Sequence, residues 1–167
     1  RMPRPLSGTG QIEVGHQLVS PSSKEKRPVA TSNLDLVQLA KEASQKAYAP
    51  YSHFPVGAAI KTKSGQVFQG CNIENASLGL TNCAERTAIF KAVSEGYQDF
   101  VGLAIYGHTD QPISPCGACR QVMTEFFDFS CSVTLISKDG TTVEMTVGEL
   151  LPYSFQGQEW APAKHLD

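Results

Sequence analysis

The order of the predicted helices and strands constrains the fold of this chain more than any other feature of the sequence. The apolar residues of Leu34–Ala40 are spaced to form one face of a helix, which we expect to end at Pro50. Two strands, Val56–Thr62 and Val67–Ile73, flank a Ser64–Gly65 turn that is typical of a hairpin. A helix followed by a hairpin therefore opens the predicted domain.

Helices and strands alternate along the rest of the chain. We predict helices at 83–95 and 116–127, strands at Val101–Tyr106, Cys131–Ile136 and Thr142–Met145, and a short helix at Val147–Leu151. This alternation indicates an α/β domain of three layers, in which helices pack on a mixed sheet of five strands.

Residues 1–33 differ in composition from the remainder of the 167-residue chain. They hold four of the ten prolines and no Phe, Tyr or Trp, so they can bury little apolar surface. We interpret 1–33 as an extended tail, in part compatible with a cloning remnant, with a transit peptide as the weaker alternative. Residues 34–167 are expected to form one domain.

Charge and cysteine content narrow the functional classes. The net charge of −2 gives no electrostatic case for a nucleic-acid partner, and no apolar run approaches the length that spans a bilayer. No signal-peptide pattern opens the sequence, so we expect a cytoplasmic protein. In a reducing compartment, the five cysteines indicate metal binding, catalysis or burial rather than disulfides.

Two cysteines open the predicted third helix in the sequence Ser114-Pro115-Cys116-Gly117-Ala118-Cys119. This spacing lets both sulfurs chelate one metal, although a redox dithiol, a structural zinc site and simple burial all produce it. Cys83 is also placed at a helix start and is the obvious third ligand. No histidine lies near these cysteines in the sequence. Three ligands without a fourth favour a catalytic zinc, which keeps one position open for water.

Glu85 follows Cys83 by two residues, in the first turn of the same helix. A carboxylate there can reach the open zinc position, take a proton from water and hand protons to a substrate. Considered alone, Glu85 would be a first-turn acidic residue that interacts favourably with the helix dipole. Arg86 is next, and we predict that it hydrogen-bonds the thiolates and withdraws their charge, unless it is a surface side chain.

Four segments together resemble the small tetrameric cytidine deaminases: Tyr51–Ala59 (YSHFPVGAA), Asn72–Ser77 (NIENAS), Cys83–Val93 (CAERTAIFKAV) and Ser114–Glu125 (SPCGACRQVMTE). A cysteine, a glutamate and a Pro-Cys-x-x-Cys motif form the zinc deaminase signature. The resemblance implies a cytidine deaminase-like fold with helices on both faces of the sheet, and a homotetramer. It also implies deamination of cytidine and 2′-deoxycytidine in pyrimidine salvage, with zinc-activated hydroxide attacking C4.

The resemblance assigns roles residue by residue. Zinc, one per chain, is bound by Cys83, Cys116 and Cys119, and Glu85 is the proton shuttle. The expected substrate contacts are Asn72 and Glu74 on the ribose hydroxyls, Phe54 in the pocket wall, the backbones of Ala84 and Ser114 on the pyrimidine edge, and Phe155 from a neighbouring subunit stacked on the base. Seen alone, Asn72 would be a turn residue, Glu74 a solvated charge, and both phenylalanines ordinary packing.

Leu78 departs from the family pattern, which often has a tyrosine there, so a hydrogen bond across the subunit interface is lost. The nearest rival is a blasticidin-type or other small aminopyrimidine nucleoside deaminase, against which the NIENAS motif favours a ribose site. Deaminases of polynucleotides and nucleotides generally use histidine where this chain has Cys83. A structural zinc or dithiol-redox module leaves Glu85, Asn72 and Glu74 unexplained. Cys71 and Cys131 have no motif partner, and we expect both to be buried strand residues.

Overall fold

The structure, a computed structural model, describes residues 33–157, so the predicted tail at 1–33 and the last ten residues lie almost entirely outside it. It contains one five-stranded sheet in the order β2-β1-β3-β4-β5. The strands are β1 (Val56–Thr62), β2 (Val67–Cys71), β3 (Phe100–Gly107), β4 (Ser132–Ile136) and β5 (Thr142–Thr146). The β3–β4 pair is parallel and the other neighbours are antiparallel, so the predicted mixed sheet is confirmed.

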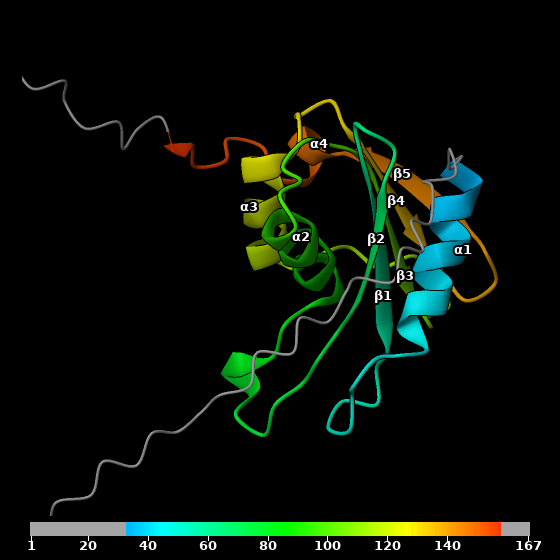
Figure 1. Cartoon of the computed structure of the whole chain (residues 1–167). Coiled ribbons are helices and arrows are strands. Elements are labelled where there is room, and N and C mark those ends of the chain that lie inside the picture. Colours follow the sequence, from blue (N-terminus) through cyan, green and yellow to red (C-terminus); the bar gives the residue numbers. More distant parts are fainter. Residues whose placement is uncertain (1–32, 158–167) are drawn as a thin grey trace, which may run out of the picture.

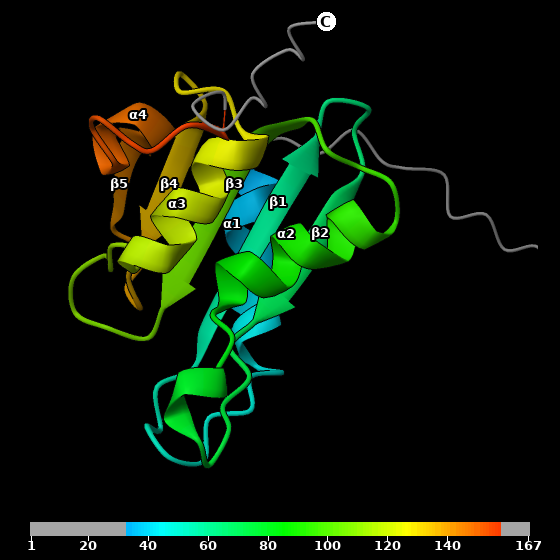
Figure 2. The ribbon, with the colours of Figure 1, turned by 90° about the vertical axis from the view of Figure 1, so that its left-hand side faces the viewer.

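Helices cover both faces of the sheet, as Figures 1 and 2 show. Helix α1 (Asn33–Ser44) lies on one face, and α2 (Ala84–Ser94), α3 (Gly117–Phe126) and the short α4 (Val147–Leu150) lie on the other. The predicted three layers are thus confirmed. None of the helices in the described part of the chain is both long and apolar enough to cross a membrane.

Alternation along β1 divides the core into two. Ala58 and Ile60 face α2 and α3 in the larger cluster, whereas Ala59 faces α1 in the smaller one. Gly70 of β2 permits a close approach of α2, because a Cβ there would lie 2.4 Å from the backbone oxygen of Ala84. The small residues of the sheet therefore set how near α2, which carries part of the candidate site, lies to β2.

Two predicted ends were wrong by two residues or more. Helix α1 ends at Ser44 rather than Pro50, since the Tyr48 N–H bonds the Asn72 carbonyl and draws the chain toward the sheet. Strand β2 ends at Cys71 rather than Ile73, because Ile73 pairs in isolated bridges with Tyr48 and Asn82. A 3₁₀ turn at Leu78–Leu80 was not predicted. Two connecting segments, 45–55 and 72–83, lie side by side and project beyond the sheet (Figure 2).

Candidate metal centre

Three cysteine sulfurs converge where α2 and α3 begin. The Sγ atoms of Cys83 and Cys116 are 3.8 Å apart, those of Cys116 and Cys119 are 3.5 Å apart, and all three lie within 4.8 Å of one another. Tetrahedral zinc with Zn–S bonds of about 2.3 Å separates its sulfurs by about 3.8 Å. The donor set and its spacing therefore fit a zinc ion bound by these three residues.

The local structure leaves the sulfurs free for this purpose. Cys83 and Cys116 occupy the N-cap positions of α2 and α3, where Ser, Thr, Asp or Asn usually accepts a backbone hydrogen bond. Neither cysteine makes a side-chain capping bond. Two helix N-termini also direct partial positive charge at the thiolates. The predicted helix starts at 83 and 116 were one residue early because these cysteines are caps.

Arg86 lies beside the sulfurs, as predicted. Its Nη2 donates to Cys83 Sγ over 3.3 Å, while its buried Nε has no hydrogen-bond partner. In the metal-free site, hydrogen bonds from Cys119, Arg86 and Cys116, the first of these the strongest, together lower the pKa of Cys83 to about 5 against the opposing effect of burial. The same pairing and burial raise the pKa of Cys119, which retains its proton. The surface alternative for Arg86 is wrong.

Glu85 points into the protein rather than toward solvent, with only 4% of its surface exposed. Burial raises the pKa of its carboxyl, and the Cys83 thiolate raises it further. A raised pKa is the direction of shift that favours a carboxyl group as a general acid or base. The structure thus places a buried carboxyl group in the first turn of the helix that Cys83 caps.

Asn72 and Glu74 lie beyond the end of β2, where both side chains hold the segment at 51–56. The Asn72 amide accepts from the Val56 N–H at 2.8 Å and donates to the Phe54 carbonyl at 2.9 Å. Glu74 accepts from the Tyr51 N–H at 2.9 Å, and hydrogen bonds from Ser52 and Tyr51 lower the pKa of its carboxyl. These bonds bring two of the four segments together, Tyr51–Ala59 and Asn72–Ser77, although the ribose contacts stay a prediction.

The remaining predicted site residues differ in exposure. Phe54 is 37% exposed and Phe155 is 51% exposed, so neither is the core residue that packing alone would suggest. Ala84 is fully buried at the first position of α2, and Ser114 is exposed in the loop before Cys116. The Phe155 carbonyl accepts from Gln121 of α3 at 3.0 Å. The structure brings Phe155 to α3 and leaves its predicted partner contact untested.

The other two cysteines lie outside this group. Cys131 is buried, as predicted, and burial raises the pKa of its thiol to about 11. It directly precedes β4 instead of lying in it. Cys71 is the last residue of β2, but it is only half-buried, so the prediction of full burial was wrong because β2 is an edge strand.

Sequence reasoning missed the residues that orient the ligands. Thr87 Oγ1 donates to the Cys83 carbonyl at 3.0 Å and accepts from Asn82 at 3.1 Å, which fixes the entry to α2. Arg120, directly after Cys119, binds the loop that precedes Cys116. The position of Arg120 directly after the cysteine motif could have predicted a role near the metal centre. No sequence pattern pointed to Asn82 or Thr87.

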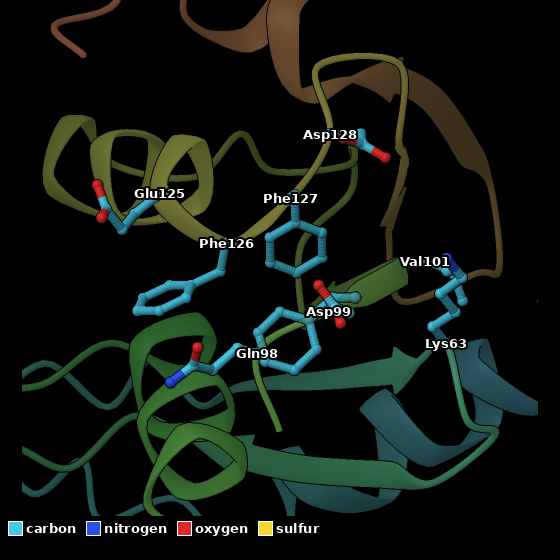
Figure 3. Close-up of a pocket in the computed structure, with 9 residues that line it drawn as sticks. Lys63, Gln98, Asp99, Val101, Glu125, Phe126, Phe127 and Asp128 are labelled. Atoms are coloured by element: carbon cyan, nitrogen blue, oxygen red, sulfur yellow. The ribbon is translucent and has the colours of Figure 1, made fainter. Parts of the chain in front are cut away.

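A hollow of about 470 Å³ lies at the opposite end of α3 (Figure 3). Phe126 and Phe127 form one side of it, and the polar side chains at its edge include Gln98 and Asp99. None of the residues that line it was predicted to bind metal or substrate. The hollow is therefore separate from the candidate metal centre.

Comparison with known proteins gives the same assignment as the geometry. Residues 30–134 match the family described as the cytidine and deoxycytidylate deaminase zinc-binding region. The chain is 50% identical over 124 residues to a cytidine deaminase of Sporosarcina psychrophila, covering 74% of this chain and 91% of the relative. It is 34% identical over 135 residues to a blasticidin-S deaminase of Bacillus cereus, covering 76% of this chain and 94% of that relative.

A solved structure agrees in fold as well as in sequence. The crystal structure of cytidine deaminase from Burkholderia pseudomallei superposes with a TM-score of 0.73 at 50% identity, covering 75% of this chain and all of the other. Family match, sequence identity and fold extend over the segments that carry the three cysteines and Glu85. The chain is a zinc-dependent hydrolase acting on C–N bonds and belongs to the cytidine deaminase family.

Proposed function

We propose that this enzyme hydrolyses cytidine and 2′-deoxycytidine to uridine and 2′-deoxyuridine, with release of ammonia, in pyrimidine salvage. The convergence of three cysteine sulfurs beside the buried carboxyl of Glu85 carries the proposal. Relatives named cytidine deaminase at 50% and 52% identity support the choice of substrate.

Cys83, Cys116 and Cys119 would hold the zinc ion, which would supply the Lewis acidity needed to activate water at C4 of the pyrimidine. Glu85 accepts a proton from the attacking water and delivers it to the ring nitrogen. It then transfers the second proton to the exocyclic amine, which leaves as ammonia. Its raised pKa suits both directions of transfer. Water and cytidine thus account for every atom of uridine and ammonia.

The substrate is expected to lie between the cysteine helices and the segment at 51–56. Asn72 and Glu74 meet the ribose hydroxyls, and the ionised Glu74 carboxylate is a suitable acceptor. Phe54 lines the pocket. The backbones of Ala84 and Ser114 flank the cysteines at the helix starts and meet the polar edge of the base.

The proposed assembly is a homotetramer in which Phe155 of one subunit stacks on the base bound by another. Exposed apolar side chains on the projecting segments 45–55 and 72–83 support an interface there. Within these segments, the most exposed of them are Leu78 at 67% and Leu80 at 72%. All five cysteines are free thiols, which is consistent with the proposed cytoplasmic location.

A comparison of Glu85→Gln with Glu95→Gln tests the chemistry. Glu95 is exposed at the far end of the same helix, so its variant controls for the loss of one carboxylate. We expect both proteins to bind about one zinc per chain, and Glu85→Gln alone to lose at least about 10²-fold in kcat for cytidine. Elemental analysis measures the zinc content, and the decrease in the ultraviolet absorbance of cytidine measures kcat. Full activity in zinc-loaded Glu85→Gln would refute the proton-transfer role.

The blasticidin-type alternative has its own support in the relative at 34% identity. Assaying wild type on cytidine, 2′-deoxycytidine and blasticidin S separates the substrates. Deamination of blasticidin S without turnover of cytidine would show that the proposed substrate is wrong while the metal chemistry stands.

A further inference from the structure

Arg120 makes three hydrogen bonds that converge on the approach to Cys116. Its Nε donates to the Pro115 carbonyl at 2.8 Å, and its Nη2 donates to Ser114 Oγ at 2.6 Å. Its Nη1 donates to the Leu150 carbonyl at 2.8 Å, at the end of α4. The planar fork of one guanidinium therefore links the loop before a metal ligand to an element 30 residues away in sequence.

The bond to Pro115 has the most direct consequence for the metal centre. The Pro115 carbonyl belongs to the peptide unit that joins Pro115 to Cys116, and this unit is planar. Fixing its oxygen fixes the orientation of the Cys116 nitrogen and hence the direction in which the Cys116 side chain leaves the backbone. Cys116 is exposed, so little packing holds it otherwise.

The bond to the Leu150 carbonyl attaches Arg120 to α4, which is held in the core. Carbonyls in the last turn of a helix lack partners within the helix, and Arg120 supplies one to α4. Leu150 is 2% exposed and part of the core, and a capping box between Thr146 and Glu149 holds the other end of α4. The loop is thereby tied, through Arg120, to a buried element.

We propose that Arg120 is a positioning residue that orients Cys116 for metal binding by tying the Ser114–Pro115 loop to α4. Unlike Arg86, Arg120 acts on the backbone before a ligand and not on a sulfur. The inference rests on the proposed role of the three cysteines as metal ligands. Lysine offers one charged group on a flexible stem and cannot reproduce three bonds of fixed direction.

The test compares Arg120→Lys with Thr146→Ala in the full chain. Thr146→Ala removes the capping box of α4 and leaves the bonds of Arg120 to the loop intact, so it controls for a general loosening of α4. Each protein is loaded with Co²⁺, whose thiolate charge-transfer absorption reports cysteine coordination. Zinc affinity is measured by competition with a chromophoric chelator, and melting temperatures show whether each variant folds.

We expect Arg120→Lys to change the cobalt spectrum and to weaken zinc binding by about 10- to 100-fold, the range for residues that orient metal ligands. Thr146→Ala should lower the melting temperature and keep the wild-type spectrum. A wild-type spectrum and affinity in Arg120→Lys would overturn the inference, as would the same spectral change in Thr146→Ala. Wild type without the thiolate–cobalt band would instead overturn the metal centre, and this inference with it.

Discussion

Gly70→Ala tests how closely α2 must approach the sheet to place Cys83. A Cβ at Gly70 would lie 2.4 Å from the Ala84 oxygen and 2.4 Å from the Ala88 nitrogen, whereas ordinary contact begins at 3.4 Å. Both neighbours are backbone atoms, so no side-chain rotation relieves the overlap. Helix α2 must therefore retreat from β2 by about 1 Å, a change of the kind that overpacking mutations force.

Overpacking of this kind costs about 1–3 kcal/mol, which for a domain of this size lowers the melting temperature by about 4–12 °C. The matched control is Gly102→Ala, also in a strand, where the added methyl meets only the end of the flexible Leu36 side chain at 3.3 Å. Alanine there also restricts the unfolded chain, so its net effect should be near zero.

Thermal unfolding of both variants, with and without zinc, measures the effect. Because α2 carries Cys83, Gly70→Ala should also bind zinc more weakly than Gly102→Ala. If the two variants melt within about 2 °C of each other and bind zinc equally, the close approach of α2 is not what positions Cys83.

Two further predictions concern residues outside the metal centre. Asn72→Ala should lower the free energy of unfolding by about 1–3 kcal/mol in urea titrations, because it leaves the buried Val56 N–H without an acceptor. An Asn72→Ala protein as stable as wild type would contradict this reason. A hydrogen bond from Ser137, with one from the Thr141 N–H, lowers the pKa of Asp139 to about 2. The stability that Asp139 contributes is therefore full above its unfolded pKa of about 3.9 and is lost as the pH falls toward 2. Asp139→Asn should have a lower melting temperature than wild type at pH 7 and nearly the same melting temperature near pH 2. A difference that persists at low pH would contradict this role of Asp139.

Local pattern was sufficient wherever one strong periodic signal marked an element. Strand β1 begins and ends where its apolar run predicted, and helices α2 and α3 differ from prediction by about one residue at each end. The end of α1 was wrong because a long-range bond between Tyr48 and Asn72 determines it. No local pattern reports a partner 24 residues away.

The sequence by itself determined the chemistry of the site. The identities and spacing of Cys83, Glu85 and the Cys116–Cys119 pair restrict the donor set to three thiolates with one acid beside them, since only these side chains supply those groups. Helix-start signals also placed them to within one residue, because capping is a local property.

Tertiary structure decided the geometry. Only the fold brings Cys83 within 3.8 Å of Cys116, buries Glu85 and turns Asn72 onto the backbone at 54–56. Arg120 bonds the Leu150 carbonyl, which lies 30 residues further along the chain, beyond β4 and β5. Distances and pKa shifts depend on which surfaces exclude water and which backbones meet, and these are properties of the packed sheet and helices rather than of any single segment.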